Sequence, residues 1–149
     1  MEARALRNKK AFHNYHILDT FEAGVALKGT EVKSLRAGNA NIADSFAKIE
    51  DDEVFLYNMY IAPYEEGGIF NLAPTRKRKL LLHRSEIKKI FGKLALKGLT
   101  LIPLKVYFNK RGSAKIELGV AKPKKLFDKR RELREKAQVR EIRKAAKRR

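Results

Sequence analysis

The sequence predicts a mainly β fold with helices: an OB-like antiparallel β-barrel of about six strands, two or three short helices and a basic C-terminal arm. Short segments with apolar–polar alternation follow one another at hairpin spacing, and only two segments have helical periodicity. The 149-residue chain has room for one hydrophobic core. The strands are too few for a sandwich and too sequential for a parallel sheet, and among small barrels the OB type agrees with the basic composition.

The first third of the chain is predicted to contain a lead-in, a long strand and a short helix. Residues 1–10 are polar and basic, which favours a flexible lead-in. Apolar alternation over residues 14–27 indicates a long strand, in which Gly24 marks a bend or a bulge. Residues 29–38 then form a short helix, because Thr30 can cap its start, its apolar residues share one face and a glycine ends it.

The middle of the chain is predicted to contain a hairpin, a loop and a further strand. Residues 46–50 and 54–62 flank an acidic turn, which predicts a hairpin. The glycines and proline of residues 64–75 indicate an irregular loop. An apolar run within residues 76–83 predicts a strand, and a helix is the alternative at this short length.

The barrel is predicted to end with a helix and a hairpin. A serine cap and an apolar stripe predict a helix over residues 85–96. Residues 99–108 and 114–120 then form a hairpin around a Lys-Arg-Gly turn. The barrel is therefore expected to span residues 11–120.

Residues 121–149 form the basic arm. They contain fourteen Lys or Arg against four Asp or Glu, a net charge of +10, which leaves +8 of the total +18 for the rest of the chain. With so few large apolar side chains, the arm is expected to be disordered alone and helical once a partner neutralises it. As a helix it lacks a single apolar stripe. Its apolar residues are Leu133 and Ala137 on one face, and Val139, Ile142 and Ala146 on the other.

The charge indicates the class of partner. A net charge of +18 favours a polyanion, either nucleic acid or, less often, an anionic membrane surface. Because a membrane-surface helix needs an apolar stripe, the arm favours nucleic acid. The sequence has no cysteine, no leader-like apolar segment after its basic start and no apolar run of membrane-spanning length. The protein is therefore expected to be soluble and cytoplasmic.

No residue pattern indicates catalysis, a metal or a cofactor. His13 and His16 would point to opposite faces of a strand, and His83 has no nucleophile nearby in a recognisable motif. The adjacent carboxylates at 51–52 and 65–66 lie in predicted turns, where acidic residues are common. We therefore expect a protein that is not an enzyme, with a structural ribosomal-type protein as the first alternative and an RNA-processing enzyme as the second.

Three groups of residues suit contacts with RNA. The basic run 76–79 could clamp phosphates, and a solvated charge run is its alternative. Lys33 and Arg36 lie beside Glu31 on the first predicted helix, and an exposed Glu31 could accept hydrogen bonds from a base or a ribose hydroxyl. Phe127, isolated among charged residues of the arm, suits stacking on a base, with anchorage onto the barrel as an equal alternative.

Segments along the whole chain, in order, resemble the SmpB (small protein B) family of bacterial tmRNA-binding proteins. The combination of GTEVKSLR, RKLLLH and a DKR-led tail is more specific than any single short motif. The matching segments are NKKAFHNYHI at 8–17, EAGVALKGTEVKSLRAG at 22–38, ADSF at 43–46, IAPYE at 61–65, RKRKLLLH at 76–83, GK at 92–93, KGLTLIPLKVYF at 97–108 and LGVAKPKKLFDKR at 118–130.

This resemblance implies that an OB-like barrel binds the tRNA-like domain of transfer-messenger RNA (tmRNA). The tail would occupy the decoding centre and mRNA channel of a stalled ribosome and so permit trans-translation. The implied partners are tmRNA and the ribosome, chiefly its small-subunit RNA, with elongation factor Tu as a candidate in the delivery complex. The implied tmRNA-binding residues are Asn14, Glu31, Lys33, Arg36, Asn41, Arg76, Arg78, Lys122, Lys124 and Lys125. The implied decoding-centre residues are Phe127, Asp128, Lys129 and Arg130.

Two positions depart from the pattern of the family. Pro123 stands where the family commonly has glycine, which predicts a stiffer connection between barrel and arm. Leu72 stands where histidine is expected.

Overall fold

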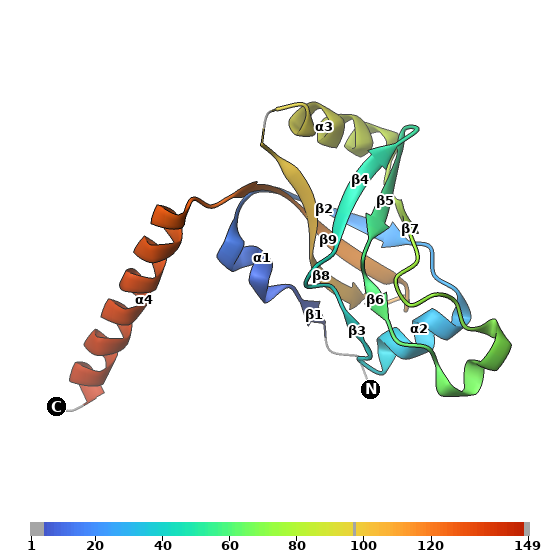
Figure 1. The fold of residues 1–149 in the computed structure, drawn as a ribbon, viewed down its shortest axis with the longest axis horizontal. Helices are drawn as coiled ribbons and strands as arrows, with labels where there is room; N and C mark the ends of the chain where they lie inside the picture. Colours follow the sequence, from blue (N-terminus) through green and yellow to red (C-terminus); the bar gives the residue numbers. More distant parts are fainter. Residues whose placement is uncertain (1–4, 97, 148–149) are drawn as a thin grey trace.

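The structure is a computed structural model that describes residues 5–96 and 98–147, with the side chains of residues 126–128 and 147 outside the described part. Strands predominate and the longest helix is the last element (Figure 1). The elements are β1 (Leu6–Arg7), α1 (Lys9–Asn14), β2 (Tyr15–Val25), α2 (Gly29–Arg36), β3 (Ala40–Asn41), β4 (Phe46–Glu50), β5 (Glu53–Tyr57), β6 (Tyr60–Ile61), the 3-10 helix η1 (Glu65–Phe70), β7 (Arg78–Leu81), α3 (Arg84–Leu94), β8 (Thr100–Phe108), β9 (Ala114–Pro123) and α4 (Leu126–Lys147).

Six antiparallel strands close into a ring. The strands follow the order β8-β4-β5-β7-β2-β9, and β9 pairs again with β8. β1 adds to β8 outside this ring, and β3 pairs with β6 as a separate short ribbon. The predicted mainly β fold of about six strands is confirmed, with short helices on the outside of the ring (Figure 1).

The core fills the interior of the ring. Its fully buried members come from strands distant in sequence, such as Leu56 of β5, Leu101 of β8 and Ile116 of β9. Ile90 of α3 is also fully buried, and Ile87 and Leu94 pack against the core, whereas Phe91, which was expected on the same core-facing stripe, is 65% exposed. A smaller cluster around Ala11 and Leu104 lies between α1 and β8.

Gly24 has a different role from the predicted bulge. The register of β2 against β9 shifts between Ile17 and Asp19, well before Gly24 along the strand. Gly24 pairs with Leu81 of β7 and with Lys115 of β9, and an added Cβ would lie 3.3 Å from the Leu81 Cβ. The glycine therefore permits the close approach of two neighbouring strands rather than an extra residue.

The ordered domain extends beyond the predicted limits of 11–120. Leu6 already pairs with β8, and the buried Asn8 side chain donates to the Pro103 carbonyl at 2.9 Å. At the other end, β9 continues to Pro123. From residue 6 onward the structure differs from the predicted flexible lead-in. The sequence analysis missed these elements because a two-residue strand and a six-residue helix contain too few residues for a periodic pattern.

The arm forms the helix α4, which projects away from the ring (Figure 1). Leu133, Val139 and Ile142 are all exposed on it. This agrees with the absence of a single apolar stripe that could dock on the ring. Among the described residues, no helix is long and apolar enough to cross a membrane.

Candidate nucleic-acid interface

Glu31 is the centre of an ion-pair network between α2 and the segment that enters β7. Its Oε1 accepts from Arg76 Nη2 at 2.5 Å and from the Lys28 backbone N–H at 3.0 Å. Its Oε2 accepts from Arg78 Nε at 2.7 Å and from Arg76 Nε at 3.1 Å. Glu31 is only 4% exposed, so the expectation of an exposed carboxylate is wrong. Glu31 also caps the start of α2, because its carboxylate accepts the hydrogen bond from the Lys28 N–H. The sequence analysis had expected Thr30 to provide this cap.

Opposing effects act on the ionisation of Glu31. Burial raises the pKa of its carboxyl group, whereas hydrogen bonds from Arg76, from the Lys28 N–H and from Arg78 lower it. The net result holds the pKa below its ordinary value of 4.5. The carboxylate therefore stabilises the folded state above that value, and this contribution is lost as the pH falls through the lower folded-state pKa.

Arg78 is fully buried and holds three segments together. In addition to Glu31, its guanidinium donates to the Met59 carbonyl at 2.5 Å and to the Pro74 carbonyl at 3.0 Å. Each of its three nitrogen atoms thus has a protein acceptor. This geometry makes Arg78 a positioning residue for α2 and the loop before β7, rather than a surface cation for a phosphate.

Lys33 and Arg36 lie on the exposed face of α2, where their cations contact aromatic rings. Lys33 Nζ lies 5.3 Å from the centre of the Tyr64 ring, and the Arg36 guanidinium lies 5.1 Å from that of Phe108. Arg36 also donates to the Gly112 carbonyl at 3.2 Å. Such contacts restrict the two side chains while leaving their charge at the surface.

A groove of about 660 Å³ separates α2 from η1. The segment predicted as an irregular loop forms its far wall, and this segment exposes Ile69 at 93% and Phe70 at 74%. These apolar residues were missed as site residues, and their only signal in the sequence was an adjacent apolar pair inside a glycine-containing loop. The groove is lined by Lys28, Gly29, Thr30, Lys33, Tyr64, Glu66, Gly67, Ile69, Phe70 and Leu72.

Arg76 and Asn41 do not line this groove. Arg76 is partly exposed and, besides its bonds to Glu31, donates to the Ala26 carbonyl at 3.3 Å. Asn41 is exposed on β3, where its Oδ1 accepts from the Ala43 N–H at 2.8 Å. Each of these two side chains therefore uses some of its hydrogen-bonding groups for contacts within the protein.

The remaining predicted barrel residues gather where β9 leads into α4. The Lys124 N–H donates to the Asn14 carbonyl at 2.8 Å, and its Nζ donates to the Phe12 carbonyl at 3.0 Å and forms an ion pair with Glu132 of α4. The Lys124 side chain is only 4% exposed, whereas Lys122 and Lys125 are exposed. The hydrogen bond and charge of Lys124 hold the pKa of Glu132 below its ordinary value. Lys124 therefore connects α1 to the arm.

The predicted decoding-centre residues lie in the first turns of α4. Arg130 is exposed and Lys129 is half-buried. The side chains of Phe127 and Asp128 lie outside the described part, so neither stacking nor anchorage of Phe127 is tested. Pro123, which stands where the family commonly has glycine, is the last residue of β9. It pairs with Tyr15 of β2, and this pairing fixes Pro123 within the ring.

The predicted residues therefore form two groups rather than one. Glu31, Lys33, Arg36, Arg76 and Arg78 meet at α2, whereas the lysines around residue 124 meet at the root of the arm. Figure 1 places α2 and α4 on opposite sides of the ring. Within residues 5–96 and 98–147, no three His, Asp or Glu side chains are grouped so that they could hold a metal ion.

Comparison with known proteins identifies the family. A family model described as SmpB protein matches residues 5–148. The chain belongs to the SmpB family. An SsrA-binding protein of Carboxydothermus hydrogenoformans is 59% identical over 145 residues, which cover 97% of each chain. An SsrA-binding protein of Thermus thermophilus is 59% identical over 130 residues, covering 87% of this chain and 90% of the relative.

A solved SmpB structure has the same fold. It belongs to the work described as "tmRNA-SmpB: a journey to the center of the bacterial ribosome" and matches with a TM-score of 0.71 at 59% identity. The match covers 83% of this chain and 87% of the SmpB chain. SmpB is a family of RNA-binding proteins and not an enzyme family, which agrees with the basic surfaces at α2 and at the arm.

Proposed function

We propose that this chain is a non-enzymatic RNA-binding factor that binds the tRNA-like domain of tmRNA and delivers it to stalled ribosomes for trans-translation. The observation that carries the proposal is the near full-length similarity to SsrA-binding proteins, at 59% identity over 97% of both chains. Agreement in fold with SmpB of a tmRNA–SmpB structure supports it. The protein would then act in the cytoplasm, where ribosomes translate.

The α2 side of the ring is the proposed tmRNA-binding face. Lys33, Arg36 and the exposed part of Arg76 supply positive charge beside a groove that also exposes apolar and aromatic surface. This combination suits a folded RNA, because cations neutralise phosphates and rings stack on unpaired bases. Glu31 and Arg78 contribute indirectly by holding α2 against the ring, and Asn41 lies on the neighbouring β3.

The arm is the proposed ribosome-binding segment. Its net charge of +10 and its lack of a docking stripe suit a helix surrounded by ribosomal RNA in the decoding centre and mRNA channel. Phe127, Asp128, Lys129 and Arg130 would lie closest to the decoding centre, and Lys122 and Lys125 would lie at the junction between the two RNAs. Elongation factor Tu is the proposed further component of the delivery complex.

Sequencing of the RNA that copurifies with the full chain tests this function. A single abundant RNA with a tRNA-like domain is expected, and its binding should weaken steeply with salt because phosphates are neutralised. Stoichiometric ribosomal RNA with no enriched tRNA-like species would instead favour a structural ribosomal protein. Turnover of RNA by the purified chain would contradict the non-enzymatic assignment.

A further inference from the structure

A separate groove lies between the second half of α3, the middle of β4 and the start of β8, and we call it the α3 groove. Its volume is about 360 Å³, within the range of sites that bind a partner group. Among the residues that line it, only Lys48 and Thr100 are polar. Figure 1 places α3 on a different side of the ring from both α2 and α4, so the two proposed RNA-binding surfaces leave this groove unused.

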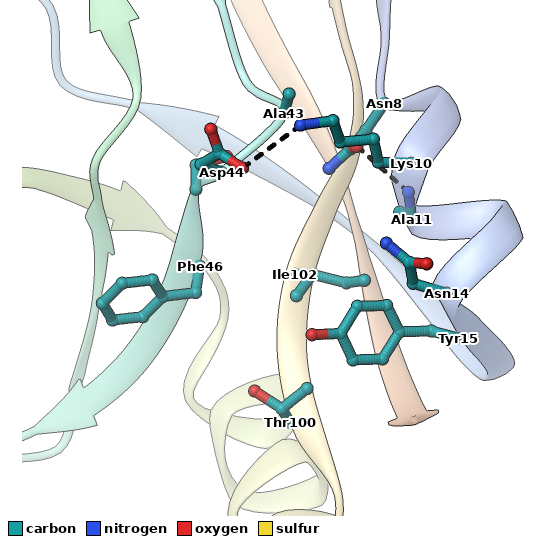
Figure 2. Close-up of a pocket in the computed structure, with 11 residues that line it drawn as sticks. Asn8, Lys10, Ala11, Asn14, Tyr15, Ala43, Asp44, Phe46, Thr100 and Ile102 are labelled. Carbon is teal, nitrogen blue, oxygen red and sulfur yellow. Dashed lines mark hydrogen bonds and ion pairs between the residues drawn. The ribbon is translucent and has the colours of Figure 1, made fainter. Parts of the chain in front are cut away.

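The α3 groove follows from the way in which the ring closes. β4 and β8 pair only at Ala47 and Leu101 in the part of the chain that the structure describes, whereas β8 and β9 pair at eight positions. Figure 2 shows Phe46 of β4 and Thr100 of β8 on the two sides of this seam. The buried Ile90 anchors α3 beside the seam, so the groove has firm walls in the unbound protein.

The wall formed by α3 exposes apolar surface. Phe91 is 65% exposed, Ala95 is exposed, and Leu94 and Leu99 are half-buried. None of these side chains is needed to close the core in the way that Ile90 is. Exposed apolar side chains that border a groove with polar residues at its rim are typical of protein-binding sites.

The same face of α3 also carries positive charge. Arg84, Lys88, Phe91 and Ala95 follow the spacing i, i+4, i+7 and i+11, which places them in one row along the helix. All four are exposed. The side chains of Arg84 and Lys88 form no ion pair or hydrogen bond with another described residue. The row is therefore cationic in its first half and apolar in its second half.

Lys48 adds a third cation from the opposite wall. Its Nζ lies 5.4 Å from the centre of the Phe46 ring and, within the described residues, has no carboxylate partner. No Asp or Glu is among the described residues that line the groove. An apolar groove with cations on both walls is complementary to a segment that carries apolar side chains between carboxylates.

We propose that the α3 groove binds an acidic amphipathic helix of a partner protein. Apolar side chains of this helix fill the groove against Phe91, and Asp or Glu side chains beside them pair with Lys48 and Lys88. An RNA base suits the groove less well, because its polar edge would lose hydrogen bonds to water and find few partners there. The partner protein can bind while RNA occupies α2 and the arm.

Site-specific photocrosslinking in growing cells of the native bacterium tests this proposal. The full chain carries p-benzoylphenylalanine in place of Phe91, and mass spectrometry identifies the adduct. We expect a protein segment in which apolar residues at helical spacing alternate with Asp or Glu. The same photocrosslinker at Leu81, which is 52% exposed on β7 outside the groove, should not give this adduct. An adduct that ribonuclease removes, or no protein adduct specific to position 91, would overturn the proposal.

Binding of a synthetic peptide of the crosslinked segment, measured by fluorescence anisotropy with the full chain, provides the second test. Phe91→Ser should weaken binding at least about tenfold, and Lys88→Glu at least about fivefold. Leu81→Ser and Lys110→Glu are the matched controls, because they change exposed residues outside the groove, and they should bind as the unmodified chain does. Equal binding by all four variants would refute the site. Thermal unfolding of each variant checks that it is folded.

This inference goes beyond the proposed function and does not depend on it. Phe91→Ser should bind the tRNA-like domain of tmRNA as tightly as the unmodified chain does. If this folded variant loses tmRNA binding, the groove belongs to the RNA-binding surface and the inference fails. If the unmodified chain itself does not bind tmRNA, the proposed function fails while the peptide measurement still decides the α3 groove.

Discussion

Replacement of Glu31 by Gln should strongly destabilise the fold, because it leaves buried arginine charge without its carboxylate. Arg78 has no exposed surface and donates to Glu31 at 2.7 Å. Removal of one partner of a buried ion pair costs about 3–5 kcal/mol. Arg78 keeps its two carbonyl acceptors in the variant, so we expect the lower end of that range, about 3 kcal/mol.

Urea unfolding at pH 7, followed by circular dichroism, measures this loss. For an m-value of about 1.5 kcal/mol per M, a loss of about 3 kcal/mol lowers the unfolding midpoint by about 2 M. Glu53→Gln is the matched control, because Glu53 pairs with Lys79 at 2.8 Å but both side chains are nearly half exposed. Its loss should stay below about 1 kcal/mol.

A double variant tests the physical reason for the effect. Glu31→Gln combined with Arg78→Met removes both charges, so the double variant should lose less stability than the sum of the single losses. A Glu31→Gln loss no larger than that of Glu53→Gln would refute the claim that Glu31 neutralises buried charge.

Other predictions follow from the same contacts. Because the folded-state pKa of Glu31 lies below 4.5, stability should fall on acidification below that pH, and Glu31→Gln should lose part of this dependence in acid titrations; an unchanged profile would contradict it. Glu31→Gln should also weaken tmRNA binding although it removes a negative charge, and tighter binding would refute its positioning role. Lys124→Met should broaden the distance distribution between the ring and α4 measured by spin labels, whereas Lys125→Met, which changes an exposed lysine, should not. Lys33→Ala should reduce the salt dependence of tmRNA binding by about 0.7–0.9 in log–log slope, and an unchanged slope would exclude a phosphate contact.

The elements that could be predicted are those with a local pattern. The helix α3 and the hairpin of β8 and β9 lie close to their predicted positions, because each has apolar periodicity and clear end signals. α1 was missed because it has six residues, of which only Ala11 is buried. The bulge in β2 carries no glycine and so left no signal near Leu18.

The site was only partly predictable, because the charge of a residue does not reveal its partners. Glu31 and Arg78 are 47 residues apart and meet only after the ring has closed. In the sequence, Lys124 is similar to its neighbours Lys122 and Lys125. In the structure, only Lys124 of these three contacts α1 and Glu132. Lys33 and Arg36 were predicted as exposed cations because helical spacing alone places them on one face.

The central claim is that the ring and the arm bind different RNAs, and a truncation after Lys125 tests it most directly. This variant keeps the hydrogen bonds of Lys124 to α1 and removes α4 entirely. Its affinity for the tRNA-like domain of tmRNA should remain within about threefold of that of the full chain, a difference of less than about 1 kcal/mol. Tagging of incomplete peptides on stalled ribosomes should be abolished in the same preparation. Equal loss of tmRNA binding and of tagging, or tagging that persists without the arm, would contradict the account.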